Sequence, residues 1–268
     1  MTSDGLLTLT SEQKRFFDEN GFVHLPGFYK GAALERLRQE YHELVTRTDH
    51  RPANMSYSYM EPPEGYSPDQ YNPKNVEGMM DQAMGGDFWI DHLTEPGIVG
   101  ALVDCLGPDL DFHNGKVRNK PPGFDATQGW HQDWPYELHS RPELAAAITY
   151  LDPTDTMAGA TEVIPGSHLQ ALPTAQGAST LVQEEVDESR AVVCKAEAGD
   201  VVIIHVLVVH RAGHNKTARS RNAIINEYKT AGAIDQWNNR CALAGMPLAR
   251  SGRPLMPRLT DWATGAAS

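Results

Sequence analysis

Six short β-like runs follow one another after residue 108, and no helical pattern separates them. They are Leu110–Arg118, Ala145–Leu151, Thr161–Ile164, Ala191–Ala196, Val201–His210 and Asn222–Tyr228. Glycine and proline interrupt the sequence between these runs. Strands at this spacing, without alternating helices, pair antiparallel and form a sandwich or a jelly roll. The sequence therefore predicts a core made of two β-sheets.

The first hundred residues have a different, helical pattern. Thr10 and the residues after it are typical of a helix start, and this helix should end near Asn20-Gly21, before a short strand over Phe22–Leu25. Leucines and a tyrosine at helical spacing predict a second helix over Gly31–Thr48. Another helical stretch covers Pro96–Leu106. We expect one domain, with a helical part over about 1–108, a β core over about 109–230 and an extension over 231–268.

An irregular stretch over residues 51–75 is rich in proline, tyrosine, serine and methionine. Long segments of this kind often cover a binding site. The Tyr57–Met60 stretch could be a lid, or a surface loop without contact to the site.

Charge and cysteine content exclude several classes of protein. The net charge of −12 disfavours binding to nucleic acid or to anionic membranes, because an acidic surface repels phosphate. No run approaches the roughly 18 apolar residues that a membrane span needs, and the first residues lack the pattern of a signal peptide. The three cysteines lie far apart, so neither a disulfide framework nor a thiolate zinc site is indicated. We therefore expect a cytoplasmic protein without membrane or nucleic-acid partners.

Two histidines and an aspartate form a candidate metal site. His131 and Asp133 are alternate residues, which point the same way in an extended chain. His210 ends the apolar run Val201–His210, and alternation places it on the same face as Val202 and Val208, with His205 on the other face. His214, in the loop that follows, is a rival third ligand. Two imidazoles and one carboxylate suit an iron(II) oxygenase, although zinc could use the same ligands.

Arginine at the entrance of the next strand is a candidate carboxylate ligand. Arg221 begins the apolar run after the loop over residues 211–220. A guanidinium group binds a carboxylate with two parallel hydrogen bonds, which would suit the distal end of 2-oxoglutarate. A surface arginine that caps the hairpin is the alternative, and Arg219 is the rival in register.

At this point the sequence resembles the phytanoyl-CoA dioxygenase family of iron(II)- and 2-oxoglutarate-dependent oxygenases. The similar motifs extend over most of the chain: Phe17-x-x-x-Gly21-Phe22, Asn119-Lys120-Pro121-Pro122, Trp130-His131-Gln132-Asp133, Ile164-Pro165-Gly166-Ser167-His168, Gly199-Asp200, and His210 with Asn215, Thr217, Arg221 and Tyr228. The interval from His210 to Arg221 is similar to the family's interval between its distal metal ligand and its 2-oxoglutarate arginine, which favours Arg221 over Arg219.

The resemblance implies a fold, cofactors and roles for individual residues. The fold would be a double-stranded β-helix of the jelly-roll or cupin type, with flanking helices. Iron(II) would bind His131, Asp133 and His210. The co-substrates would be 2-oxoglutarate and O₂, with ascorbate as a reductant. A carboxylate at position 133 implies hydroxylation or a related oxidation of a small organic molecule, since the related halogenases have a small residue there.

Further residues are assigned by the resemblance or by their position near the motifs. Lys116 and Thr217 are expected to bind the co-substrate with Arg221. Lys116 lies on one alternating face of the run Leu110–Lys120, with Phe112, Asn114, Arg118 and Lys120, unless this is a solvated edge strand. Trp130, Trp134 and Arg118 are candidate substrate contacts, and core packing is the alternative for the two tryptophans.

Two other classes of function would use the same metal ligands. A cupin-like metal protein, an isomerase or a binding protein, would have no use for Arg221 in a keto-acid site. A zinc hydrolase would need a general base near the metal-bound water. Glu137 is the only candidate close in sequence, and no sequence feature positions it. The substrate is expected to be a free acid, an amine or a natural-product intermediate.

Overall fold

A computed structural model describes residues 5–46, 57–59, 76–123, 129–173, 186–236 and 241–258 of the chain. Most of the irregular stretch over 51–75 lies outside these residues, so its suggested role as a lid stays a prediction. Within it, Tyr57–Tyr59 forms strand β2, which pairs with β3.

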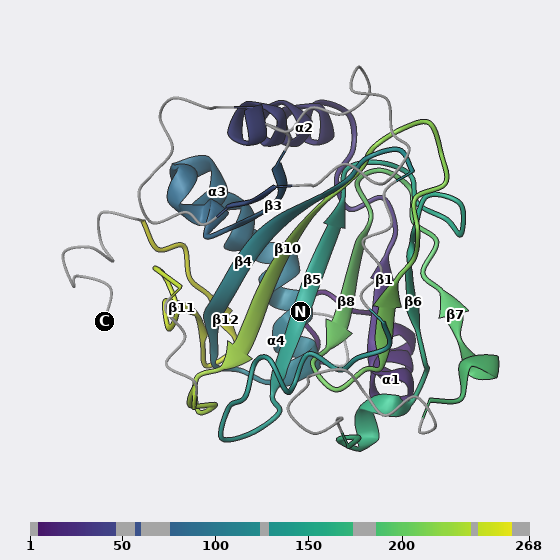
Figure 1. The fold of residues 1–268 in the computed structure, drawn as a ribbon. Coiled ribbons are helices and arrows are strands. Elements are labelled where there is room, and N and C mark those ends of the chain that lie inside the picture. Colours follow the sequence, from purple (N-terminus) through teal and green to yellow (C-terminus); the bar gives the residue numbers. More distant parts are fainter. Residues whose placement is uncertain are drawn as a thin grey trace.

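Two antiparallel sheets of unequal size form the core (Figure 1). The large sheet has the strand order β1-β8-β5-β10-β4-β11-β12, with β3 also paired to β4, and the small sheet has the order β7-β6-β9. The strands are β1 (Phe22–Leu25), β2 (Tyr57–Tyr59), β3 (Val76–Met80), β4 (Leu110–Lys120), β5 (Leu144–Tyr150), β6 (Thr161–Val163), β7 (Val192–Val193), β8 (Val201–His205), β9 (His210–Ala212), β10 (Arg221–Thr230), β11 (Pro247–Arg250) and β12 (Arg253–Pro254).

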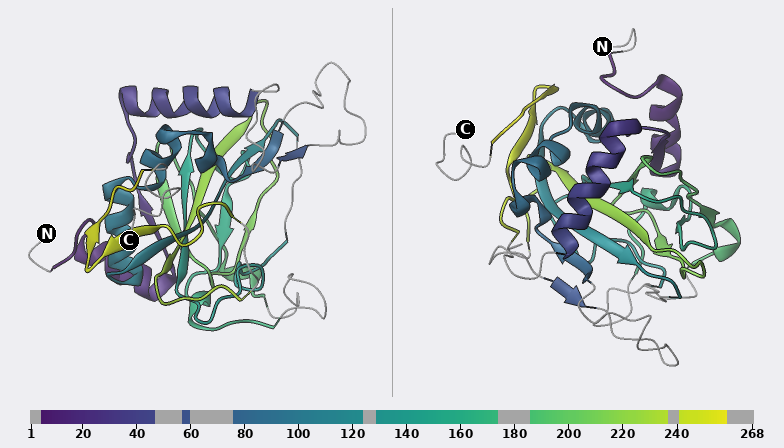
Figure 2. Two further views of the ribbon diagram at one scale, coloured as in Figure 1. Left: turned by 90° about the vertical axis from the view of Figure 1, so that its left-hand side faces the viewer. Right: turned by 90° about the horizontal axis from the view of Figure 1, so that it is seen from above.

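Helices cover the outer face of the large sheet, as the turned views show (Figure 2). They are α1 (Ser11–Asn20), α2 (Gly31–Thr46), α3 (Asp87–Leu93) and α4 (Pro96–Leu106), with short 3₁₀ turns at Gln82–Gly85, Ser167–Leu169 and Glu188–Arg190. The predicted helix starts and ends are confirmed to within two residues. Thr10 caps α1 in a capping box with Gln13, and Gly21 ends this helix in a left-handed conformation.

Alternation along the strands separates two hydrophobic clusters. Outward residues such as Ala147 on β5 and Ile203 on β8 pack in one cluster with Ile90 of α3 and Leu102 of α4. Inward residues pack instead against the small sheet: Ile148, Tyr150, Val202, Ile204 and Ala223 meet Val163 and Cys194. The inner face of the large sheet is therefore partly apolar, under the small sheet, and the functional side chains share that face.

A bulge changes which residues of β4 face inward. Lys116, Arg118 and Lys120 lie opposite Ile225, Ala223 and Arg221 of β10. Directly paired residues point to the same side of a sheet, so these three cations face inward with the buried Ala223. The register then shifts between Glu227 and Tyr228. Phe112 consequently packs outward with Tyr228, which corrects the prediction that Phe112 shares a face with Lys116.

The predicted strand Val201–His210 is wrong as a single strand. Strand β8 ends at His205, and β9 begins at His210 in the other sheet. The four residues between them cross from one sheet to the other. All four are buried, and they belong to three hydrophobic clusters: Val206 and Leu207 to one, Val208 to a second and Val209 to a third. Because every residue of the crossover is apolar, the sequence pattern does not reveal the break.

Gln132 holds this crossover beside the segment that contains His131. Its Nε2 donates to the carbonyl oxygens of Leu207 (2.6 Å) and Gln170 (2.9 Å), and its Oε1 accepts from the backbone N–H of Leu172 (2.9 Å). The side chain is fully buried. One amide thus satisfies three backbone groups, of which the carbonyl oxygen of Leu207 is buried.

We predict that Gln132→Met destabilises the fold by about 1–3 kcal/mol, because this side chain of similar length leaves the buried carbonyl oxygen of Leu207 without this partner. Urea unfolding of the variant measures the loss. Gln39→Met is the matched control, since Gln39 is exposed on α2, and its free energy of unfolding should stay within about 0.5 kcal/mol of the wild type. Equal stability of both variants would show that the Gln132 amide does not hold the crossover.

Candidate metal and co-substrate site

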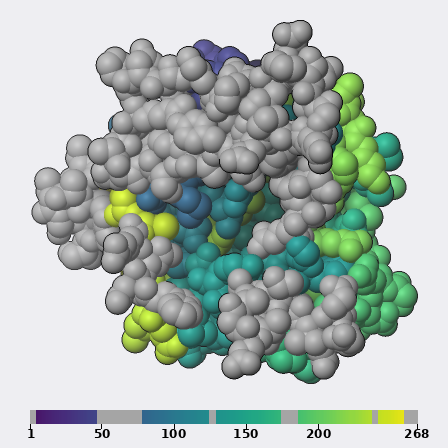
Figure 3. All heavy atoms as spheres, in the orientation of Figure 1, coloured from purple at the N-terminus to yellow at the C-terminus, as the bar shows by residue number. Residues whose placement is uncertain are grey.

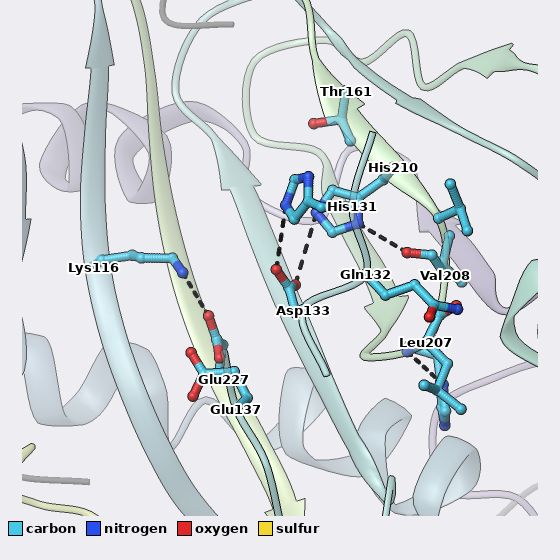
Figure 4. Close-up of polar contacts among 12 residues, drawn as sticks. Lys116, His131, Gln132, Asp133, Glu137, Thr161, Leu207, Val208, His210 and Glu227 are labelled. Carbon is cyan, nitrogen blue, oxygen red and sulfur yellow. Dashed lines mark hydrogen bonds and ion pairs between the residues drawn. The ribbon is translucent and has the colours of Figure 1, made fainter. Parts of the chain in front are cut away.

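His131, Asp133 and His210 come together on the inner side of the two sheets (Figure 4). His131 and His210 face each other across an isolated bridge, in which each backbone N–H donates to the other residue's carbonyl oxygen. Asp133 Oδ1 lies 3.5 Å from His131 Nε2, and Asp133 Oδ2 lies 3.8 Å from His210 Nε2. One ligand atom from each residue lies within 4.8 Å of the others.

Alternation places His131 and Asp133 on one side of their extended segment, as the sequence predicts, and directs Gln132 between them toward the crossover (Figure 4). His210 reaches the same side for a different reason than the one predicted. His210 is the first residue of β9, and it reaches this position because the chain has crossed from the large sheet to the small one. The triad is therefore assembled by the pairing of two backbones, not by the face of one long strand.

Both imidazoles are oriented for metal binding. His131 Nδ1 donates to the carbonyl oxygen of Gly129, and His210 Nδ1 donates to that of Val208, each at 2.9 Å. A ring whose Nδ1 carries the proton has its lone pair on Nε2, which in both rings is the atom nearest Asp133. Burial and the neighbouring His131 lower the pKa of His210 to about 4, so this ring is neutral at physiological pH.

The carboxylate of Asp133 stays ionised in this buried setting. Burial alone would raise its pKa, but the neighbouring His210 and His131 and the charge of Lys116 outweigh that effect and hold the pKa well below its usual range. Two imidazole nitrogens and one anionic oxygen are the donor set of a non-haem iron(II) site with open positions. The residues present therefore fit an iron(II) ion.

Arg221 lies at the start of β10, on the inner face and 4% exposed. Its Nη2 donates to the carbonyl oxygen of Gly159 at 2.8 Å, and its guanidinium carbon lies 5.7 Å from the centre of the Tyr150 ring. Its Nε has no hydrogen-bond partner among the described residues. A buried guanidinium with an unused donor fits the distal carboxylate of 2-oxoglutarate.

Arg219, the rival in register, lies on the exposed turn before β10. Its backbone carbonyl oxygen accepts hydrogen bonds from Asn215 and Thr217 in that turn. The structure thus favours Arg221 as the carboxylate ligand. Thr217 is part of the same turn, with its hydroxyl bonded to Asn215 Oδ1 at 2.7 Å, and its role toward the co-substrate stays a prediction.

Two alternative histidines lie elsewhere. His205 Nδ1 accepts from the backbone N–H of Leu207, and its ring packs against Phe17 and His168. His214 Nε2 contacts the carbonyl oxygen of Gly123. Neither belongs to a candidate metal cluster among the described residues.

The predicted substrate contacts divide into two groups. Trp130 is 2% exposed and packs with Ile164 and Val209, under the guanidinium of Arg211. Trp134 packs against a cluster that contains Leu144 and Leu207. These positions favour the packing interpretation for both tryptophans. Arg118 faces inward, two residues along β4 from Lys120, and its contact with substrate stays a prediction.

Lys116 points along the sheet toward Glu227 of β10 (Figure 4). Its Nζ lies 2.7 Å from Glu227 Oε1. Burial would lower the pKa of Lys116, but Glu227 and Asp133 raise it above its ordinary value, so the ammonium group is charged. The direct partner of Lys116 is therefore a carboxylate of the protein, and its contact with the co-substrate stays a prediction.

Sequence analysis missed Glu227 and His113, and it found no feature that positions Glu137. In the structure the backbone N–H of Glu137 donates to the carbonyl oxygen of Asp133, and its carboxylate pairs with His113. Alternation along β10 could have predicted the position of Glu227, because it lies on the same face of the strand as Arg221 and Ala223. The β4 bulge concealed His113.

Comparison with known proteins places these features in a family. The family model for phytanoyl-CoA dioxygenase matches residues 17–223, which is most of the chain. The human peroxisomal phytanoyl-CoA dioxygenase is 28% identical over 243 residues, covering 83% of this chain and 69% of that protein. A probable alpha-ketoglutarate-dependent hypophosphite dioxygenase of Stutzerimonas stutzeri is also 28% identical, covering 83% and 79%.

Solved structures share the fold at lower sequence identity. EctD from S. alaskensis, crystallised with 2-oxoglutarate and 5-hydroxyectoine, has a TM-score of 0.72 at 17% identity, covering 93% of this chain and 86% of that one. The alpha-ketoglutarate-dependent carbocyclase SnoK has a TM-score of 0.67 at 19% identity, covering 98% and 94%. The predicted mainly β, cupin-like fold with flanking helices is confirmed.

The predicted cofactors are likewise confirmed at the level of the family, whose members use iron(II), 2-oxoglutarate and O₂. The enzyme is a dioxygenase that acts on a small molecule, and the alternative of a cupin-like protein without oxygenase activity has no support. None of the helices that the structure describes combines the length and apolar character required to cross a bilayer. On the match over residues 17–223, the chain belongs to the phytanoyl-CoA dioxygenase family.

Proposed function

We propose that His131, Asp133 and His210 bind the iron of this oxygenase and that Arg221 binds 2-oxoglutarate. The observation that carries the assignment of the co-substrate site is the buried Arg221 guanidinium, which keeps an unpaired Nε–H on the same inner face as the triad. A zinc hydrolase or a simple metal-binding protein would gain nothing from this group. An anionic co-substrate would satisfy it and neutralise its charge.

The chain's own residues would do three things in this reaction. The two imidazoles and Asp133 would hold the metal through one ligand atom each. Arg221 orients the co-substrate through its distal carboxylate, and Tyr150, beneath the guanidinium, keeps this part of the site dry. When bound, the iron supplies the oxidation of substrate by O₂, coupled to the conversion of 2-oxoglutarate into succinate and CO₂.

We propose hydroxylation, or a related oxidation by oxygen, as the outcome. Asp133 supports it, because its carboxylate lies beside both imidazoles, whereas the resemblance implies a small residue at this position in the related halogenases. A small organic molecule is the expected substrate. We further propose a single catalytic domain, supported by the pairing of β1 from the helical part and β11 from the C-terminal part with the large sheet. The cytoplasm is the proposed location, supported by three free cysteines.

His131→Ala should abolish turnover. The variant loses one of three ligands, so we expect uncoupled succinate formation from 2-oxoglutarate, with Fe(II), ascorbate and O₂, to fall at least 100-fold. Iron bound after gel filtration should fall in parallel. His205→Ala is the matched control, because it removes a partly buried histidine at the end of β8 that lies outside the triad, and it should keep iron. Full iron occupancy in His131→Ala would contradict the assignment.

Arg221→Ala should act mainly through co-substrate binding. Losing a buried charge-assisted contact costs about 2–4 kcal/mol, so KM for 2-oxoglutarate should rise roughly 30- to 900-fold while iron binding is retained. Arg219→Ala removes the exposed arginine two residues earlier and should leave KM within about twofold. If Arg219→Ala raises KM and Arg221→Ala does not, the co-substrate ligand is Arg219 and the assignment is wrong.

A further inference from the structure

A second polar cluster lies beside the triad on the inner face of the large sheet. It comprises His113, Asn114 and Lys116 of β4, Glu227 of β10 and Glu137 from the loop after Asp133, and it is called here the acidic cluster. Lys116 pairs with Glu227 Oε1 at 2.7 Å, and His113 pairs with Glu137. Asn114 Nδ2 donates to Glu227 Oε2 at 3.0 Å and to Glu137 Oε1 at 3.2 Å. Figure 4 shows the two carboxylates together, across from Asp133.

The acidic cluster lies beyond the reach of a co-substrate held by Arg221. Glu227 is six residues after Arg221 on the same strand, and a strand rises about 3.3 Å per residue, so the two side chains leave the sheet roughly 20 Å apart. A five-carbon diacid that is anchored at Arg221 and chelates the metal does not extend to Glu227. The acidic cluster therefore faces the part of the site that is left for the primary substrate.

The surface of the molecule is hollowed at this place. In the space-filling view, atoms of the β4–β5 region and of the C-terminal third of the chain line the bottom of a hollow at the centre of the face (Figure 3). This hollow gives a small molecule a route toward the inner face of the large sheet.

The acidic cluster has more acceptors and more negative charge than its own donors satisfy. Glu137 and Glu227 are two carboxylates, whereas Lys116 is the only side chain of the cluster with a permanent positive charge. Asn114 is 1% exposed, and its Oδ1 has no hydrogen-bond partner among the described residues. Burial raises the pKa of Glu227 to about 7 even though Lys116 opposes the shift. A buried site with unpaired acceptors and excess negative charge is stabilised by a cation that carries N–H donors.

We propose that Glu137 and Glu227 bind a positively charged nitrogen group of the primary substrate, an ammonium or a guanidinium, and so determine which substrates the enzyme accepts. This inference rests on the proposed function. Two adjacent carboxylates, together with the unpaired Oδ1 of Asn114, offer the acceptors that a guanidinium or ammonium group requires. A free acid or a coenzyme A ester would place negative charge beside them and is disfavoured. Among the expected classes, the acidic cluster selects an amine.

A divalent metal ion is the alternative occupant. One ligand atom from each of His113, Glu137 and Glu227 lies within 4.8 Å of the others. However, the Lys116 ammonium group already pairs with Glu227, and the Asn114 amide directs its N–H groups at both carboxylates. A metal ion would have to displace these donors, whereas a nitrogen cation adds to them. The geometry thus favours a nitrogen cation.

The test measures binding to the enzyme loaded with Fe(II) and 2-oxoglutarate, by calorimetry without O₂. The probes are two matched pairs: agmatine with its neutral counterpart N-(4-acetamidobutyl)urea, and methylguanidinium with methylurea. The wild type should bind the cation of at least one pair ten or more times more tightly than its neutral partner. Glu137→Gln and Glu227→Gln should each reduce that preference at least fivefold. Glu19→Gln, on the exposed side of α1, should keep it.

Three results would overturn the proposal: no preference for either cation in the wild type, a preference that survives in both glutamine variants, or a second equivalent of bound Mn(II) that Glu137→Gln abolishes. Glu137 is the less buried of the two carboxylates, so its variant decides the matter if Glu227→Gln fails to fold. Uncoupled succinate formation by the wild type, measured separately, decides the proposed function. Turnover without cation preference would therefore reject only the substrate class.

Discussion

The buried guanidinium of Arg221 is the interaction on which the architecture of the site depends. A charge that is 4% exposed is costly unless it is paired, and its described partners are one carbonyl oxygen and the face of one tyrosine ring. The large sheet supplies this position because Arg221 opens β10 on the inward side, opposite Lys120. Its Nε–H remains for a ligand, and a dicarboxylic acid that also chelates the metal meets this requirement.

The second constraint is the crossover between the sheets. The proximal pair, His131 and Asp133, lies on a loop segment, and the distal ligand His210 begins the small sheet. Gln132 connects that segment to the crossover through the carbonyl oxygen of Leu207, and to residues 170–172 through two further backbone groups. The residue between the two proximal ligands thus fixes the backbone that carries the third. The triad can keep its shape before metal binds because hydrogen bonds, and not the metal, set the orientation of both imidazoles.

Much of the fold and of the triad could be predicted from the sequence, because both rest on local patterns. Capping at Thr10 and the leucine spacing of α2 predict their helices, and the alternate positions of His131 and Asp133 predict a shared direction. Two features could not be predicted. The crossover at residues 206–209 consists of apolar, buried residues, as a buried strand does, so its sequence looks like the continuation of β8. The bulge that reverses Phe112 depends on pairing with β10, which a single run of sequence does not encode.

The acidic cluster shows the same limit more sharply. Its members come from positions 113–116, 137 and 227, and no one segment has an unusual pattern. The pairing of β4 with β10 brings Asn114 opposite Glu227, and the backbone contact to Asp133 places Glu137 beside them. Metal ligands follow a motif because their spacing is short. Residues that face the substrate are collected from across the fold, so pocket chemistry becomes visible only in three dimensions.

Anaerobic titration of the Fe(II)-loaded protein with 2-oxoglutarate tests the central claim most directly. Chelation of the metal by the keto acid gives a weak visible charge-transfer band. The structure predicts that this band saturates at one 2-oxoglutarate per chain in the wild type, and that Arg221→Ala reaches the same amplitude only at much higher 2-oxoglutarate. A wild-type protein that binds iron but gives no band at any 2-oxoglutarate concentration would contradict the assignment of this site.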